Sequence, residues 1–200
     1  MAPGVRVRVV AGRLRGRALT APAGDATRPT GARVKEALFS ILGDVSGTRV
    51  LDLYAGSGAL GIEALSRGAA SAVFVESARA ALACLRENLT KLQLDPIATT
   101  LPLRVEGAAA QLKRHGPFEL VLCDPPWRDV TAAQRELEAL ARAGLFAPGA
   151  RIVLEHGAKD ALPAPEGSTR LRMCDERRWG DTAIAFFEPA DVPGPAREPA

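Results

Sequence analysis

Cysteine, histidine and aromatic residues are scarce in this sequence, and each scarcity argues against a class of protein. The three cysteines, Cys84, Cys123 and Cys174, are too few and too scattered for a disulfide framework, so we expect a protein of the reducing cytoplasm. Only two histidines are present, with no cysteine pair near either, so we expect no metal site. Aromatic residues make up 4% of the chain, so each of them carries more weight than usual.

Long apolar runs are also missing. A membrane-spanning helix needs roughly 18 consecutive apolar residues, and no such run occurs, so we expect no membrane partner. The opening MAPGVRVRVVAGRLRGRAL has no long apolar stretch before a cleavage site, so we expect no secretory signal. With 200 residues, 47% of them apolar, the chain can bury one full core, and we expect a monomer with one main domain.

Charge is distributed unevenly along the chain. The net charge is +3, yet residues 1–35 hold eight basic side chains and one acid, which leaves the rest slightly acidic. The eight basic residues are Arg6, Arg8, Arg13, Arg15, Arg17, Arg28, Arg33 and Lys35. A basic arm on an acidic body is typical of a protein that binds a polyanion, although an arginine-rich solvated surface would give the same count. Arginines 170, 172, 177 and 178 either widen this basic face or form a solvated edge.

The order of predicted elements indicates the fold. Residues 5–20 alternate apolar residues with arginine around Gly12 and Gly16, which predicts a β-hairpin, and residues 21–30 form a linker. A helix is predicted over 32–43. Strands are then predicted at 48–54, 71–76, 101–106, 118–123 and 150–155, with helices at 59–67, 78–93, 108–114 and 131–143 between them.

Two further strands, near 168–174 and 182–188, have no helix between them. This pattern predicts an α/β fold with a doubly wound, mostly parallel seven-stranded sheet and an antiparallel edge. We therefore divide the chain into a basic hairpin and linker (1–30), a main domain (31–188) and a tail (189–200). The tail holds four prolines and is predicted to be disordered.

A glycine-rich loop follows the first long strand, in DLYAGSGALG (52–61). Gly56 and Gly58 allow a tight turn and a close backbone approach to a ligand, and Glu76, about twenty residues on, can accept hydrogen bonds from ribose hydroxyls. This pattern fits NAD and S-adenosylmethionine (AdoMet) alike, and a glycine turn without a ligand would share it. Asp52 favours AdoMet, because a carboxylate there would repel a pyrophosphate but not an ammonium and a sulfonium. The expected cofactor residues here are Asp52, Ala55, Gly56, Ser57, Gly58, Glu76 and Ser77.

A second motif, DPPW (124–127), ends the buried strand 118–123. In a doubly wound sheet this strand neighbours the first, so Asp124 and the residues after it should face the cofactor. An exocyclic amine of a nucleobase is a poor nucleophile because its lone pair is delocalised. The Asp124 carboxylate and the Pro125 carbonyl, held outward by Pro126, could grip its hydrogens, and Trp127 could stack on the base. The alternative is that Asp124 caps the next turn, the prolines stiffen a loop and Trp127 belongs to the core.

The motif resembles that of AdoMet-dependent amino-methyltransferases, in which an Asp, Asn or Ser precedes two prolines and an aromatic residue. More closely, five blocks in order resemble the bacterial small-subunit (16S) ribosomal RNA guanine-N2 methyltransferase family. They are RVVAGRLRGRAL, TRPTGARVKEALFSIL, VLDLYAGSGALGIEALSRGA, DPPW and WGDTAIAFFE. The resemblance implies a class I methyltransferase fold, AdoMet as methyl donor with S-adenosylhomocysteine (AdoHcy) as product, and a guanine of 16S rRNA as substrate. The sequence does not distinguish naked rRNA, a partly assembled subunit and a complete subunit as the form that is methylated.

The resemblance also implies roles for individual residues. Asp124, Pro125, Pro126 and Trp127 would hold the target amine, while Asp52, Gly56, Gly58 and Glu76 would hold the cofactor. Arg28, Pro29 and Thr30 would lie near the cofactor entrance, and Arg33 and Lys35 would face RNA or the loop, while the arginine hairpin would dock on RNA. Two departures stand out: Trp127 replaces the usual Tyr or Phe, and Gly107 stands where an Asn or Asp often binds the adenine amine, so a backbone group of Gly107 or Ala108 would serve instead.

Other functions remain open from the motifs alone. The same grip would serve adenine N6 in DNA or RNA, or a glutamine side chain in a protein. The arginine arm argues against a protein substrate, and the absence of an added recognition domain argues against sequence-specific DNA modification. An NAD oxidoreductase would leave Asp52 and DPPW unexplained. A catalytically inactive RNA-binding protein is disfavoured by the intact glycine loop and Asp124.

Overall fold

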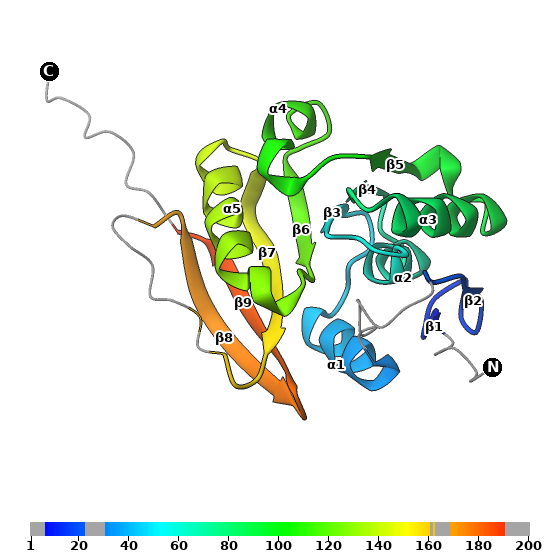
Figure 1. The fold of residues 1–200 in the computed structure, drawn as a ribbon, viewed down its shortest axis with the longest axis horizontal. Helices are drawn as coiled ribbons and strands as arrows, with labels where there is room; N and C mark the ends of the chain where they lie inside the picture. Colours follow the sequence, from blue (N-terminus) through cyan, green and yellow to red (C-terminus); the bar gives the residue numbers. More distant parts are fainter. Residues whose placement is uncertain (1–6, 23–30, 161, 163–168, 191–200) are drawn as a thin grey trace, which may run out of the picture.

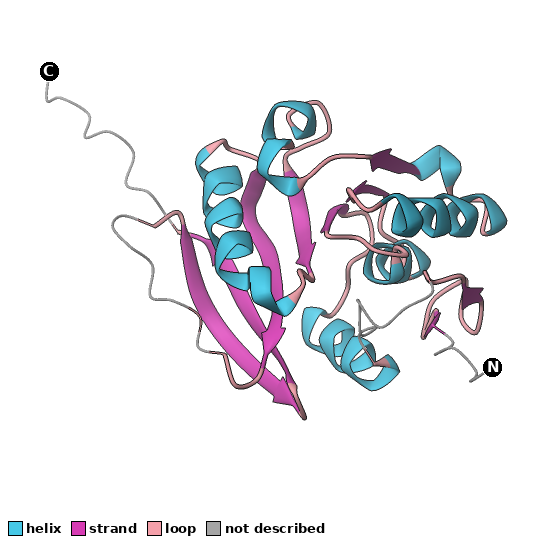
Figure 2. Ribbon diagram, in the orientation of Figure 1, coloured by secondary structure: helices cyan, strands magenta, loops and turns pink. Residues whose placement is uncertain are grey.

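The computed structural model describes residues 7–22, 31–160, 162 and 169–190, and a seven-stranded sheet with helices on both faces forms its main body (Figures 1 and 2). The strand order is β5-β4-β3-β6-β7-β9-β8. The strands are β3 Arg49–Leu53, β4 Ser71–Val75, β5 Ala98–Leu101, β6 Phe118–Cys123, β7 Phe146–Gly157, β8 Leu171–Trp179 and β9 Thr182–Pro189. Strands β3 to β7 pair in parallel, while β9 runs antiparallel to β7 and β8. The predicted fold class, with its antiparallel edge, is confirmed.

Two layers of helices bury the two faces of the sheet. On one face lie α1 Ala32–Leu42, α2 Ala59–Ser66 and α3 Arg79–Lys91; on the other lie α4 Ala109–Leu112 and α5 Val130–Arg142. Short 3-10 helices occur at η1 Asp95–Ile97, η2 Val105–Gly107 and η3 Trp127–Asp129. Helix α5 shows why such segments are helical: Val130, Ala133, Leu137 and Leu140 recur at helical spacing and are all buried.

The predicted amino-terminal hairpin is present. Strand β1 Val7–Arg8 pairs antiparallel with β2 Ala18–Leu19 and forms a separate two-stranded sheet beside α2 and α3 (Figure 1). Its connecting loop is attached to α2, because the Glu63 carboxylate accepts the amides of Val10 and Ala11 at 2.7 and 2.9 Å. The basic arm therefore packs against the main domain.

The strand predicted at 101–106 is misplaced, since β5 covers residues 98–101. Pro102 has no N–H to extend the ladder with β4, and the chain turns so that the Leu103 amide donates to the Leu101 carbonyl at 2.9 Å. Residues 105–107 then form η2 instead of a strand. Strand β7 is longer than predicted, at 146–157 rather than 150–155.

Several predictions fall on residues that lie outside the described part of the chain. These are most of the linker, at 23–30, and the end of the tail, at 191–200. The division at residues 30 and 188 stays a prediction. Among the described residues, no helix has both the length and the apolar character to cross a bilayer.

Candidate functional site

The two motifs meet at the carboxyl ends of neighbouring parallel strands. Leu53, at the end of β3, pairs with Val75 of β4 on one side and with Cys123 of β6 on the other. The glycine loop, Glu76 and Asp124 follow these three strand ends directly. The predicted adjacency of the glycine loop and the DPPW motif is therefore confirmed, and it lies at the edge of the sheet where doubly wound folds bind ligands.

Two positions of the glycine loop have a backbone conformation that favours glycine. Gly56 and Gly58 have φ of 57° and 83°, in the left-handed region. A Cβ on Gly58 would lie 2.5 Å from Leu85 Cδ1 of α3, so a side chain there would also force Leu85 to shift. The loop closes when the Gly58 amide donates to the Ala55 carbonyl at 2.7 Å, and α2 begins immediately afterwards.

Glu76 holds the glycine loop in place. Its Oε2 accepts the Gly56 amide at 2.8 Å and its Oε1 accepts the Ala78 amide at 2.6 Å. Each carboxylate oxygen can accept more than one hydrogen bond, so the side chain can hold this loop and still accept ribose hydroxyls. Ser77, between these contacts, is exposed.

Asp52 is buried, with 1% of its surface exposed. Its Oδ2 accepts the Gly61 amide at 2.9 Å, in the first turn of α2. Burial raises the pKa of this carboxyl well above its usual range, and the nearby charges of Asp124 and Glu76 act in the same direction. From the sequence, Asp52 was expected to face a ligand over the strand end. In the structure its carboxyl is directed at α2, where it anchors the helix that follows the glycine loop.

The DPPW motif forms an elbow after β6. Pro125 is buried, whereas Trp127 is 38% exposed, which does not fit the alternative that Trp127 belongs to the core. The Pro126 carbonyl accepts the Asp129 amide at 2.7 Å and so begins η3, whose N-cap is Pro126 without a side-chain hydrogen bond. A Cβ on Gly157 would lie 3.2 Å from Trp127 Cε3, so the end of β7 passes directly beside the ring.

Two buried polar residues near the elbow were not predicted to act there. Strand β7 pairs Leu154 with Cys123, so Glu155, still within β7, lies level with Asp124, which directly follows β6. Glu155 is 5% exposed and His156 is fully buried. The His156 Nδ1 lies 3.0 Å from the Gly157 carbonyl, and its Nε2 lies 3.7 Å from Glu176 Oε2. The sequence held one signal for these two residues: the apolar run in IVLEHG (152–157) ends in polar residues.

The residues expected near the adenine lie in η2. The amides of Gly107 and Ala108 donate within this turn, to the carbonyls of Arg104 and Val105 at 3.2 and 3.1 Å. These amides are thus already used, and Ala108 is fully buried. Gly107 is exposed, and the space beside its Cα is open: a Cβ built there would meet no atom within 4 Å.

The structure describes six of the eight residues that were expected to face RNA. Five are exposed: Arg8, Arg13, Arg15, Arg17 and Arg33. Lys35 does not face RNA, and this expectation was wrong: the side chain is 2% exposed, and its Nζ donates to the Arg8 carbonyl at 2.7 Å and pairs with Glu63 Oε2 at 3.2 Å. Burial lowers the pKa of Lys35, and Glu63 opposes that effect. Arg6, Arg28, Pro29 and Thr30 lie outside the described residues.

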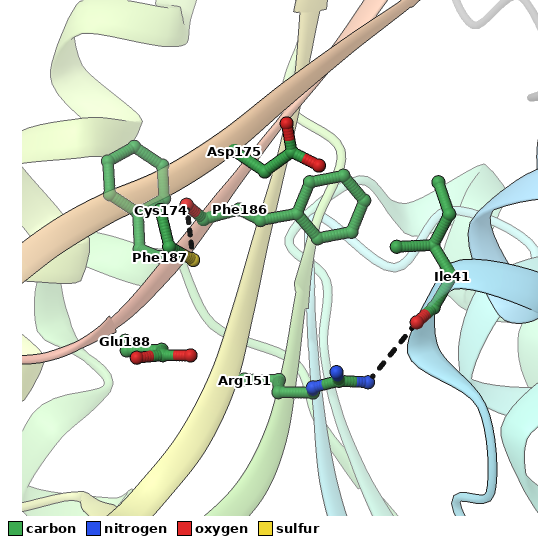
Figure 3. Close-up of a pocket in the computed structure, with 7 residues that line it drawn as sticks. All are labelled: Ile41, Arg151, Cys174, Asp175, Phe186, Phe187 and Glu188. Atoms are coloured by element: carbon green, nitrogen blue, oxygen red, sulfur yellow. Dashed lines mark hydrogen bonds between the residues drawn. The ribbon is translucent and has the colours of Figure 1, made fainter.

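A pocket of about 140 Å³ lies between the end of α1 and strands β7, β8 and β9, away from the strand ends that carry the two motifs (Figure 3). Its lining residues are Ile41, Arg151, Cys174, Asp175, Phe186, Phe187 and Glu188. Figure 3 shows the Arg151 guanidinium directed at the Ile41 carbonyl, to which it donates, as it does to Leu42. Arg151 fastens α1 to the sheet, and we assign the pocket no part in the site.

Comparisons with known proteins agree with this geometry. The family model described as Conserved hypothetical protein 95 matches residues 7–188. The chain is 36% identical over 184 residues to "Putative rRNA methyltransferase YlbH" of Bacillus subtilis, covering 91% of this chain and 98% of that one. It is 37% identical over 185 residues to "Ribosomal RNA small subunit methyltransferase D" of Escherichia coli, covering 92% and 90%. The solved structure of "Putative methyltransferase yhhF" from Escherichia coli is similar with a TM-score of 0.75 at 32% identity, covering 92% and 98%.

Proposed function

The chain belongs to the family described as Conserved hypothetical protein 95, which includes the ribosomal RNA small subunit methyltransferase D proteins, and on this premise we propose that it methylates a guanine of 16S rRNA at the exocyclic N2 amine, with AdoMet as donor. The observation that carries the proposal is the pairing of β3 with β6, which sets the glycine loop beside the DPPW elbow. Neither motif alone separates a methyltransferase from its rivals. Their adjacency supports one site with a cofactor on one side and a planar amine on the other.

The residues around the glycine loop fit AdoMet. The positive φ of Gly56 and Gly58 leaves their backbone open to close approach, and Glu76 is oriented by two backbone amides with acceptor capacity remaining for ribose hydroxyls. When bound, AdoMet supplies an electrophilic methyl group, and AdoHcy remains as product. Asp52 contributes by anchoring α2 and by placing a carboxyl close below the loop.

The elbow would act mainly by positioning. In the proposed mechanism, the Asp124 carboxylate and the Pro125 carbonyl accept the two hydrogens of the amine, which localises its lone pair toward the methyl group. Trp127 stacks on the base and sets its plane, a contact worth about 1–3 kcal/mol. The partial exposure of this ring, and its support by Gly157, favour such a role. No strong base is needed before attack, because the amine loses its proton only after positive charge develops.

The substrate class rests on the relatives and on the basic arm. The relatives are named as rRNA or ribosomal RNA small subunit methyltransferases, and the exposed arginines of the hairpin and of α1 suit a phosphate backbone. A guanine in a folded RNA must leave its stack to reach the elbow. We therefore propose that the arm holds RNA while the elbow holds one flipped guanine.

Methyl transfer from labelled AdoMet, followed by nucleoside analysis, tests the proposal. The substrates are unmodified small-subunit rRNA and small subunits that lack the modification, which also separates free from assembled RNA. We expect labelled N2-methylguanosine with the wild type and with the surface control Asp95→Ala, and a loss of at least a hundredfold with Asp124→Ala. Trp127→Ala should lose about 10- to 100-fold, as expected from the stacking energy, while Trp127→Phe retains most activity.

Other outcomes would redirect the proposal. Label in N6-methyladenosine would keep the mechanism and overturn the substrate. Label in no RNA, despite AdoMet binding, would overturn an RNA substrate and direct the search to proteins. Activity that survives Asp124→Ala would overturn the proposed grip.

A further inference from the structure

Asn88 of α3 lies between the basic arm and the glycine loop. Its side chain is completely buried. Its Oδ1 accepts the Thr20 amide at 2.8 Å, and its Nδ2 donates to the Thr20 carbonyl at 2.9 Å and to the Ser57 carbonyl at 3.0 Å. One amide group thus joins the residue that leaves the hairpin to the centre of the glycine loop, which lie 37 residues apart in the sequence.

The two donations fix the orientation of this amide. The Nδ2 group has two hydrogens, and each has its own acceptor, one in the arm and one in the loop. A buried amide of this kind is costly to leave unsatisfied, so the arm and the loop are held in one relative geometry. Displacing Thr20 would disturb the group that supports Ser57.

The rest of the arm is fastened to the same half of the molecule. Ser66 of α2 donates to the Ala11 carbonyl at 2.6 Å and accepts the Leu14 amide at 2.9 Å, and Glu63 holds two neighbouring amides. Helix α2 begins at the glycine loop, and α3 packs against it at Gly58. The arm is therefore mounted on the helices that shape the cofactor loop.

We propose that Asn88 is a positioning residue that couples the binding of RNA on the arm to the binding of cofactor in the glycine loop. The inference rests on the proposed function, since it takes AdoMet or AdoHcy as the ligand of the loop and small-subunit rRNA as the ligand of the arm. RNA bound on the arm restrains Thr20 further, Asn88 transmits this restraint to Ser57, and the loop then loses less freedom when the cofactor binds. By linkage, bound cofactor tightens RNA binding by the same factor.

The test measures the dissociation constant of AdoHcy by calorimetry on the full chain, without RNA and with saturating unmodified small-subunit rRNA. In the wild type we expect the dissociation constant of AdoHcy to be lower by a factor of about five or more when RNA is present. In Asn88→Ala this ratio should fall to about one. Asn88→Asp keeps the oxygen that accepts from Thr20 but loses the donations to the Thr20 and Ser57 carbonyls, so it gives the same answer if the alanine variant does not fold.

Ser66→Ala is the matched control, because it removes two hydrogen bonds to the arm without touching Ser57. It should weaken RNA binding and leave the dissociation constant of AdoHcy without RNA at the wild-type value. In steady-state assays the Asn88 variants should raise the KM for AdoMet severalfold while kcat at saturating AdoMet stays within twofold. A protein that is only partly folded would instead show a lower apparent kcat, in proportion to its folded fraction, with the KM for AdoMet unchanged.

The failures of the two proposals are distinguishable. A wild type that binds AdoHcy and RNA with no change in either affinity overturns the coupling, and so does an Asn88 variant that keeps the wild-type ratio. A wild type that binds no AdoHcy at all overturns the proposed function.

Discussion

At the scale of single residues, Asp52 shows how this site uses a carboxyl group. The side chain lies inside a buried strand, keeps one hydrogen bond to the Gly61 amide, and has its pKa raised chiefly by burial. Gly61 itself has no room for a side chain, since a Cβ there would lie 2.4 Å from a ring carbon of Phe74. Strand β3 and helix α2 are thus locked together directly below the glycine loop.

The raised pKa of Asp52 makes a prediction about stability. A carboxyl whose pKa is higher in the folded than in the unfolded chain costs stability as the pH rises above its unfolded value of about 4 and toward its folded value. Asp52→Asn removes this cost and retains an oxygen for the Gly61 amide. The free energy of unfolding of the variant, minus that of the wild type, should therefore increase between pH 4 and pH 7. Urea unfolding of both proteins at pH 4 and at pH 7 measures this difference in unfolding free energy. A difference that is the same at the two pH values would show that Asp52 ionises normally.

At the scale of elements, α1 and α2 are joined by charge as well as by apolar contact. Glu63, which is fully buried, pairs with Lys35 at 3.2 Å and with Arg67 at 2.9 Å and also accepts two amides of the arm. Lys35 occupies the same face of α1 as Leu38, Phe39 and Leu42. The pair belongs to the packing between helices and to the attachment of the arm.

Removal of Lys35 should therefore act on stability. Lys35→Ala leaves Glu63 buried without one of its cations, and we expect a loss of about 3–5 kcal/mol of unfolding free energy. Arg33→Ala, two positions earlier on the exposed face of the same helix, should change stability by less than about 0.5 kcal/mol. Urea unfolding compares the two variants. Equal, small losses would mean that the Lys35 and Glu63 pair adds nothing to the folded state.

Elements were largely predictable from the sequence, because local patterns determine them. The alternation of apolar strands and amphipathic helices indicated the parallel sheet, and each motif follows the strand end that was expected. Strand β5 was misplaced because LPLRVE has strand composition, while Pro102 interrupts the ladder. Lys35 was misassigned because a count of basic residues ignores helical phase. The contacts of Asn88 had no local signal, since Thr20 lies 68 residues away.

At the scale of the whole molecule, the arginines form two different populations. Those of the hairpin, Arg13, Arg15 and Arg17, are exposed. The arginines of the edge strand β8 are exposed as well, but they are paired: Arg172 with Glu188, Arg177 with Asp175 and Arg178 with Glu176, at 2.7–3.1 Å. Neighbouring carboxylates offset the charge of the edge, so the basic face is centred on the arm.

This difference should appear in the salt dependence of RNA binding. Replacement of Arg13, Arg15 and Arg17 by Ala should lower the slope of log affinity against log salt by about 0.7–0.9 for each phosphate that the arm no longer neutralises. The matched replacement of Arg172, Arg177 and Arg178 should leave the slope nearly unchanged. Fluorescence anisotropy with small-subunit rRNA over a series of salt concentrations measures both. Equal decreases would mean that RNA also runs along the β8 edge.

The attachment of the arm has a consequence for how the chain is made. The arm is synthesised before α2 and α3, and its partners Glu63 and Asn88 follow it by 52 to 68 residues. At about 5–20 residues per second, the wait from Thr20 to Asn88 is on the order of 3–14 s. During that interval an arginine-rich segment emerges, without its partners, beside the RNA of the translating ribosome. Translation of the α2 and α3 segments therefore sets the earliest moment at which the arm can be withdrawn into the fold.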